Sequence, residues 1–331
     1  MKILLIAKPW KGGLSHYLFQ ALKDLFPDSV EWWPTYPVIA ERFDYIRNKK
    51  RWREALARKI ERSDYTAAIF IGMPLPLRDT RNRERNVLWH FDSPRPTPDQ
   101  VAPFGRVYIS DPGYAPEVLA ALAPERYGGE LSFAHSPGVH RLPAVATQRT
   151  GLCFIGNKDP KRDLHLSYLF KAGYRPLVFG NYFLRRPVAW RYPWCFRPAV
   201  GNEGMGKIYA QHEISINIHA QVVRNGTNMR TFECAGYGIP QVVEYRPGLE
   251  AHFEPGREIL TYNALEEMPE QIDRLLRDQK FAAELAVRAH RRALAEHTYY
   301  HRAATLLRGV LSGDEQRLLD GRLRHIVAAL E

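Results

Sequence analysis

The sequence predicts an α/β protein that consists of two Rossmann-like, doubly wound domains followed by C-terminal helices. The chain has 331 residues, and at about 150 residues per domain this length favours two domains. Hydrophobic residues make up 45% and charged residues 25% of the chain, which is the usual composition of a globular protein. Strand-like and helix-like stretches alternate in two separate series, a pattern typical of parallel sheets covered by helices.

The first series begins with a buried apolar strand at residues 2–7, which leads into a loop that contains Gly12 and Gly13. A helix is expected over residues 14–25, because its leucines recur at helical spacing. The remaining elements are a basic helix and three strands, expected at residues 41–63, 65–72, 86–91 and 106–110. This series is expected to form a domain over residues 1–140.

The second series follows a linker at residues 136–150 that is rich in proline and glycine. Its four expected strands lie at residues 152–155, 176–179, 214–218 and 241–244. Helices are expected at residues 164–172, before residue 211, from residue 229 and, almost without interruption, from residue 265 onward. The second domain is therefore expected over residues 150–290, with further helices over residues 291–331.

The charge of the chain points to an anionic substrate or partner. Its formal net charge is +11, with 35 arginines against 12 lysines. The planar guanidinium suits phosphates and carboxylates, although an arginine-rich composition of the whole proteome would explain the same count. The basic helix at 41–63 could bind a nucleic acid, an anionic glycan or an anionic membrane surface, or could simply be a solvated face.

Several classes of protein are excluded by what the sequence lacks. The three cysteines form no C-x-x-C pair, which argues against a disulfide framework and a zinc ribbon. The histidines show no complete set of metal ligands, so no metal is expected. No apolar run approaches 18 residues, so no helix should span a membrane. We expect a cytoplasmic protein, with peripheral attachment to the inner membrane surface as an alternative.

Residues 224–240 carry the most informative pattern. Asn225, Thr227 and Asn228 lie in a turn that starts a helix, with Thr227 or Asn228 as the N-cap. The free N–H groups of a helix N-terminus form a natural site for a diphosphate. Arg230 and Glu233 share a helical face because they are three residues apart. Arg230 can neutralise phosphate, and Glu233 can accept hydrogen bonds from a ribose diol. An ordinary capped helix with a surface ion pair is the alternative.

This pattern resembles the donor-site motif of GT-B glycosyltransferases, in particular the CgeB-like group of the group 1 glycosyl transferases. The shared order is a strand that ends in Asn217, then N-x-R-x-F-E at residues 228–233, then glycines and a strand. Three further segments resemble the same family: the stretch from Phe154 to Arg162, the turn at Gly180, and H-T-Y-x-x-R at 297–302. The resemblance implies two Rossmann-like domains that face a cleft, with C-terminal helices that cross back onto the first domain.

The N-terminal half resembles phage DNA β-glucosyltransferases, which share the GT-B architecture. The strand at 87–91 leads into Asp92, as in the segment that carries their general base. The resemblance implies Asp92 as the base, Arg230 and Arg162 as phosphate ligands, and Glu233 as the ribose ligand. His90 is the reserve base, and an Asp-Ser-Pro turn is the alternative for Asp92.

Other donor-site residues follow from the same resemblance. Gly12 and Gly13 resemble the glycine loop that faces the donor, with a plain turn as the alternative. Retaining GT-B enzymes of the E-x7-E kind carry glutamate eight residues before Glu233. This chain has Asn225 there, which favours inversion.

The aromatic and arginine-rich stretch at 181–200 offers a further binding surface. Its rings could stack on a nucleobase or on an acceptor ring, or they could pack inside a connector. The sequence does not say which.

Together these observations predict a metal-independent hexosyl- or pentosyltransferase without a cofactor. Its donor would be a nucleotide-diphosphate sugar, with UDP or TDP as the leaving group. The sequence does not identify the acceptor; an anionic glycan, DNA and a peripheral membrane surface are candidates. Two alternatives remain open: a glycosyltransferase that modifies a hydroxylated DNA base, and a non-catalytic protein of the same fold that binds nucleotides or nucleic acid. The oligomeric state is left open.

Overall fold

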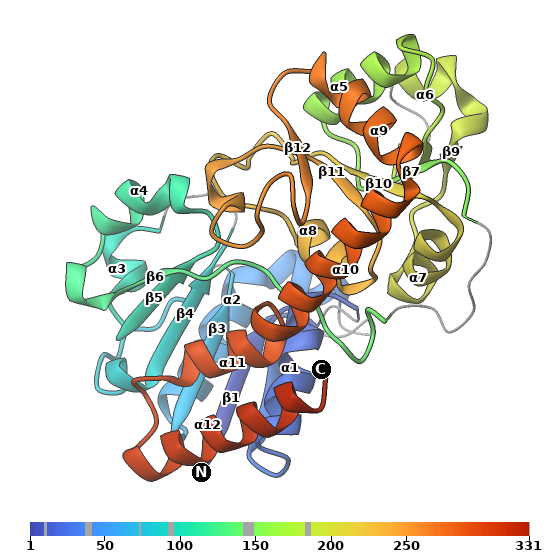
Figure 1. Cartoon of the computed structure of the whole chain (residues 1–331). Coiled ribbons are helices and arrows are strands. Elements are labelled where there is room, and N and C mark those ends of the chain that lie inside the picture. The colour runs from blue at the N-terminus through green and yellow to red at the C-terminus, as the bar shows by residue number, and fades with distance from the viewer. Residues whose placement is uncertain are drawn as a thin grey trace. The chain divides into compact units, whose positions relative to one another are not determined.

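The computed structural model describes residues 1–9, 12–36, 42–72, 74–91, 96–141, 149–182 and 187–330 (Figure 1). The chain divides into two compact units. Unit 1 comprises Met1–Phe133 together with Tyr299–Ala329, and unit 2 comprises Ala134–Thr298 with Leu330. Each unit is described below by itself.

Unit 1 is built on a six-stranded parallel sheet with the order β2-β1-β3-β4-β5-β6. Its strands are β1 (Ile3–Ala7), β2 (Val30–Pro34), β3 (Ala67–Ile71), β4 (Asn86–His90), β5 (Arg106–Ile109) and β6 (Tyr127–Glu130). The central strands β1, β3 and β4 are buried along their whole length. This is expected of a parallel sheet with helices on both faces.

The helices of unit 1 come from both ends of the chain. They are α1 (Leu14–Leu25), α2 (Arg42–Glu61), α3 (Pro98–Val101), α4 (Ala115–Leu119), α11 (Tyr299–Leu307) and α12 (Gly313–Ala328). The bounds of α1 confirm the predicted helix over 14–25. Helix α11 packs against α1, and the rings of Tyr17 and Tyr299 lie 5.5 Å apart there.

Unit 2 has a second six-stranded parallel sheet, with the order β12-β11-β10-β7-β8-β9. Its strands are β7 (Leu152–Ile155), β8 (Leu177–Phe179), β9 (Phe196–Arg197), β10 (Ile214–Asn217), β11 (Gln241–Glu244) and β12 (Leu260–Tyr262). Its helices are α5 (Pro160–Lys171), α6 (Pro187–Arg191), α7 (Asn202–Gln211), α8 (Met229–Gly236), α9 (Glu267–Arg277) and α10 (Gln279–Glu296). The two sheets confirm the predicted α/β class with two doubly wound units.

The chain leaves unit 1 after Phe133 and returns to it after Thr298, and the H-T-Y-x-x-R segment spans this return. Within unit 2, the amide of His135 donates to the carbonyl of His297 at 3.0 Å. Within unit 1, Arg302 donates to the carbonyl oxygens of Ser132 and Phe133, at 2.8 Å to each. Burial lowers the pKa of Arg302 to about 10. Hydrogen bonds therefore link residues 297–302, where the chain returns to unit 1, to residues 132–135, where it leaves that unit.

Candidate functional site

The candidate site of unit 2 lies where several parallel strands end. The carboxyl ends of neighbouring parallel strands meet at one edge of a sheet, where α/β proteins bind their ligands. Strand β10 ends at Asn217 and pairs with β7, which leads into Gly156, and with β11, which ends at Glu244. The first turns of α5 and α8 follow β7 and β10 at this edge.

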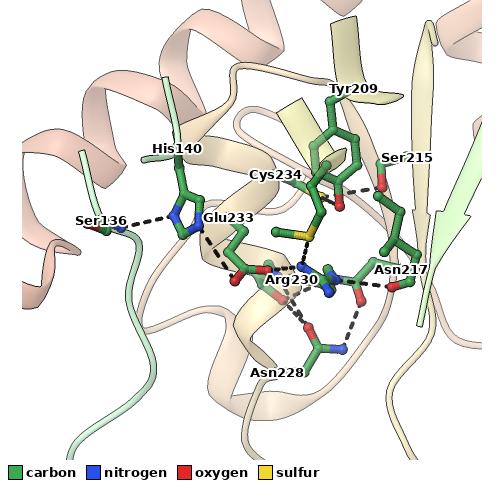
Figure 2. A network of polar contacts seen from close by, with 12 residues as sticks. Ser136, His140, Tyr209, Ser215, Asn217, Asn228, Arg230, Glu233 and Cys234 are labelled. Atoms are coloured by element: carbon green, nitrogen blue, oxygen red, sulfur yellow. Dashed lines mark hydrogen bonds and ion pairs between the residues drawn. The ribbon is translucent and has the colours of Figure 1, made fainter. Parts of the chain in front are cut away.

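The start of helix α8 is held by two asparagine side chains. Asn228 is the N-cap, and its Oδ1 accepts from the amide of Thr231 at 3.2 Å. Its Nδ2 donates to Oδ1 of Asn217 at 2.8 Å, while Nδ2 of Asn217 donates to the Thr231 hydroxyl at 3.1 Å (Figure 2). Of the two residues that the sequence offers as the N-cap, Thr227 and Asn228, the structure has Asn228. Through these hydrogen bonds, the side chains of Asn228 and Asn217 hold the first turn of α8 against the end of β10.

Arg230 and Glu233 form an ion pair on one face of α8, as their spacing predicts (Figure 2). Nη1 of Arg230 donates to the Glu233 carboxylate, and Nε donates to the Ile155 carbonyl at the end of β7 at 3.1 Å. The Arg230 side chain keeps 27% of its surface exposed, whereas that of Glu233 keeps 2%. Burial acts to lower the pKa of Arg230, but the neighbouring Glu233 raises it above its ordinary value. The guanidinium is therefore a fixed, permanently charged group.

His140 approaches Glu233 from the other side (Figure 2). Burial, aided by the charge of Arg230, lowers the pKa of His140 to about 3, so the ring is neutral at pH 7. Its Nδ1 lies 2.9 Å from the amide of Ser136, which can only donate. The ring proton is therefore on Nε2, which lies 3.8 Å from Oε1 of Glu233. No pattern in the sequence indicates His140, which lies more than 90 residues from Glu233 in the chain.

The contacts of Glu233 with Arg230 and His140 leave little of its carboxylate accessible for the expected contact with a ribose. The carboxylate is enclosed by Arg230 and His140, and the residue is 1% exposed. Burial raises the pKa of Glu233, although the guanidinium of Arg230 opposes that effect. In this structure the Glu233 side chain orients Arg230 and presents almost no surface to a ligand.

A second group of charges surrounds the end of β11. Glu244 is bound by Lys161 at 2.8 Å and by Arg246 at 2.7 Å, so two cations share one carboxylate. Nearby, Arg162 donates through Nε to the Ile218 carbonyl and through Nη1 to the Asn157 carbonyl. Burial lowers the pKa of Lys161 and of Arg162. We call Lys161, Arg162, Arg246 and Glu244 the basic cluster; it carries an excess of positive charge.

Two buried polar side chains at this edge have no partner among the described residues. The ring of His219 is 0% exposed, and neither of its nitrogens has a hydrogen-bond partner there. The same holds for the hydroxyl of Thr227, a predicted donor residue that is 2% exposed. Burial, and then the positive charges of Arg246, Lys161 and Arg162, lower the pKa of His219 well below its ordinary value. Burying a polar group without a partner costs about 1–3 kcal/mol, so such groups call for an explanation.

Gly180 and Asn225 are the remaining predicted residues of unit 2; the first is buried and the second is exposed. A Cβ atom on Gly180 would lie 1.9 Å from the carbonyl oxygen of Gly156, so only glycine fits where β7 and β8 end. Asn225 is exposed, and its carbonyl accepts from the amide of Gly248 at 2.7 Å. Gly180 thus allows the backbone after β8 to contact the backbone after β7, and its missing side chain leaves no space there for a ligand.

Three of the predicted residues of unit 1, Gly12, Gly13 and His90, lie in the described part of the chain. Gly12 has a φ of 79°, and Gly13 is the N-cap of α1, whose first turn it starts. His90 ends β4, and its Nδ1 lies 3.2 Å from the Gly72 carbonyl. Since a carbonyl can only accept, Nδ1 of His90 is the donor in this contact. Asp92, the expected base, lies outside the described residues.

The described part of the chain contains neither a candidate metal site nor a candidate membrane-spanning helix. No group of three or more histidine, cysteine, aspartate or glutamate side chains there could hold a metal ion. Likewise, no helix there combines the length and the apolar character needed to cross a bilayer.

Comparison with known proteins gives the class to which this fold belongs. Residues 164–308 match a family described as glycosyl transferase-like. No curated protein matches the sequence. The structure is similar to a sucrose-phosphate synthase from Thermosynechococcus elongatus, with a TM-score of 0.66, 10% identity and 100% of each chain covered.

Two further solved structures support the same class. The Anabaena protein HepE in complex with UDP and glucose has a TM-score of 0.59 and 10% identity, over 100% of this chain and 99% of that one. The lipopolysaccharide outer core galactosyltransferase WaaB has a TM-score of 0.52 and 9% identity, over 98% and 100%. At these identities the likeness concerns the fold, and the fold is that of the GT-B glycosyltransferases.

Proposed function

We propose that the protein is a glycosyltransferase that moves a sugar from a nucleotide-diphosphate donor to an acceptor hydroxyl. The observation that carries this proposal is the geometry of Arg230. Its guanidinium lies on the first turn of α8, is held by Glu233 and the end of β7, and keeps 27% of its side chain exposed. A fixed cation beside a helix N-terminus can stabilise the negative charge that develops on a leaving diphosphate.

Other groups at the same edge support a diphosphate ligand. The basic cluster adds positive charge, with Arg162 as a second phosphate ligand. The unpartnered Thr227 hydroxyl and His219 ring would gain hydrogen bonds from a bound donor. Glu233 acts first as the residue that orients Arg230, and its contact with a ribose would require the side chain to turn. The similar HepE structures hold UDP, so UDP is the first nucleotide to test.

The acceptor half of the reaction is assigned to unit 1. The acceptor hydroxyl would give its proton to Asp92, or to His90 as the reserve base, as its oxygen attacks the anomeric carbon. The bond between that carbon and the diphosphate breaks, and the configuration inverts. The reaction needs no cofactor besides the donor, because arginine and lysine side chains neutralise the diphosphate. The buried thiols of the three free cysteines suit a cytoplasmic location.

The first test is a thermal-shift series with UDP, TDP, GDP and UDP-glucose. A ligand at a hundredfold excess over its dissociation constant raises the free energy of unfolding by about 2.7 kcal/mol. We expect UDP or TDP to stabilise the wild type and to have a much smaller effect on Arg230→Lys, since lysine cannot keep both anchoring hydrogen bonds. Arg257→Lys, in an exposed ion pair of the same unit, is the matched control.

The outcomes separate the candidate functions. Stabilisation by one nucleotide, together with its release from the corresponding sugar donor, supports the transferase. Stabilisation without turnover on any acceptor, hydroxylated DNA included, would favour the non-catalytic binding protein. If no nucleotide shifts the unfolding of the wild type, the proposed donor site is wrong.

A further inference from the structure

The surface around α6 exposes two tryptophans. Trp190 is 69% and Trp194 is 61% exposed, the two highest values among the large hydrophobic side chains that the structure describes. They lie in α6 and in the short helix η5 (Pro193–Cys195), which joins α6 to the edge strand β9. Val188 and Ala189 form the buried face of α6, which leaves Trp190 and Arg191 outside. We call Trp190, Trp194, Arg175, Arg191 and Arg197 the Trp–Arg surface.

The Trp–Arg surface has a rigid base. Tyr192, between the two tryptophans, stacks on the buried ring of Phe170 with 4.3 Å between centroids and an interplanar angle of 20°. Trp194 meets the edge of Tyr192 at 6.1 Å, and the Arg175 guanidinium lies 5.3 Å from the Tyr192 ring. Arg197 donates to the Trp194 carbonyl at 2.8 Å. Trp194, Arg175 and Arg197 are therefore held by contacts with this base before any partner binds, which lowers the entropic cost of binding.

The charge of this part of the chain has one sign. Residues 171–200 contain six basic residues and no aspartate or glutamate, although the chain has 36 acidic residues in all. Arg175, Arg191 and Arg197 are exposed. An anionic partner would thus meet cations and tryptophans without an opposing carboxylate from this segment.

We propose that the Trp–Arg surface attaches the protein to an anionic lipid bilayer. Tryptophan, with its apolar body and polar N–H, prefers the boundary between headgroups and acyl chains, and arginine binds anionic headgroups. Helix α5, which contacts α6, also exposes an aliphatic side chain, Leu164 (59%), and a leucine inserts among acyl chains but does not stack on bases. This attachment is independent of the proposed donor site.

The experiment is flotation of the whole protein with lipid vesicles. Vesicles of phosphatidylcholine are compared with vesicles that also contain phosphatidylglycerol, for the wild type and for Trp190→Ala/Trp194→Ala. We expect the wild type to bind the anionic vesicles, less so as salt is added, and the double variant to bind about tenfold more weakly or worse. The matched control is Leu318→Ala, which removes an exposed apolar side chain in unit 1 and should leave binding unchanged.

A second measurement keeps the test independent of folding. Lipids with brominated acyl chains should quench wild-type tryptophan fluorescence, and the quenching should be lost in Trp190→Phe/Trp194→Phe. Equal binding by the wild type and the double alanine variant would overturn the proposal, as would absence of binding to anionic vesicles. Tryptophan-dependent binding to a single-stranded oligonucleotide without binding to vesicles would also overturn it, in favour of a nucleic acid.

Discussion

Replacement of Glu233 by glutamine tests whether this residue holds Arg230 in place. The substitution preserves size and one acceptor oxygen but removes the negative charge beside a guanidinium that is mostly buried. Removing one partner of a buried ion pair costs about 3–5 kcal/mol, whereas losing a hydrogen bond to a charged group costs about 1.5–3 kcal/mol. Because the amide oxygen still accepts a hydrogen bond and water reaches 27% of Arg230, we expect a loss of about 2 kcal/mol.

The assay is calorimetric unfolding of the full chain, in which the transition of unit 2 is recognised by its shift with nucleotide. For a unit of this size, 1 kcal/mol corresponds to about 2–4 °C, so Glu233→Gln should lower that transition by about 4–8 °C. Nucleotide affinity should fall in parallel, since Arg230 loses the group that orients it.

The matched control is Glu254→Gln. Glu254 pairs with Arg257 at the same three-residue spacing, but both side chains are more than half exposed. Exposed ion pairs contribute about 0–1 kcal/mol to the free energy of unfolding, so Glu254→Gln should have little effect. If Glu233→Gln were no more destabilising than Glu254→Gln, or if it left nucleotide affinity unchanged, the assigned role of Glu233 would be wrong.

Three further predictions concern the same unit. Gly180→Ala should destabilise it by about 3 kcal/mol or more in urea unfolding, because the new Cβ would lie 1.9 Å from the Gly156 carbonyl oxygen. Gly201→Ala, which has open space but replaces the N-cap of α7, should cost no more than about 1 kcal/mol. His219→Leu should leave the free energy of unfolding unchanged or raise it by about 1 kcal/mol, since it removes a buried polar group without a described partner. Isothermal titration should nevertheless show weaker UDP binding; a loss of stability with full binding would contradict this. The pKa of His140 is lowered to about 3 in the folded protein, whereas in the unfolded chain it has its ordinary value of 6.5. The stability that depends on a neutral His140 is therefore fully present above pH 6.5 and is lost as the pH falls toward 3. The free energy of unfolding should decrease below pH 6.5 by about 1.4 kcal/mol per pH unit for this residue, and His140→Asn should flatten that slope.

The sequence predicted best those features that depend on neighbouring residues. Helix 14–25, the N-cap at Asn228 and the shared face of Arg230 and Glu233 all follow from local periodicity or spacing, and the structure confirms them. The outer strands β2, β6, β9 and β12 were missed. They are short and, apart from β12, partly exposed, so they lack the buried apolar run that marks the inner strands.

The parts of the candidate site that the sequence did not predict depend on contacts between distant segments. The approach of His140 to Glu233 joins residues far apart in the chain, and no local pattern reports it. The asymmetry of the ion pair, with Glu233 enclosed and Arg230 partly exposed, is set by packing rather than by spacing. Similarly, composition showed that residues 181–200 are aromatic but not that Tyr192 packs while Trp190 and Trp194 stay outside.

The discontinuous unit 1 has a consequence for biosynthesis. A ribosome that has translated residue 298 has already made nearly all of unit 2, whereas unit 1 still lacks α11 and α12. Until Arg302 emerges, the carbonyl groups of Ser132 and Phe133 lack its guanidinium, and α1 lacks the ring of Tyr299. We therefore expect the unit that is translated first to finish folding last. A nascent chain released early would contain a folded unit 2 beside an incomplete, protease-sensitive unit 1.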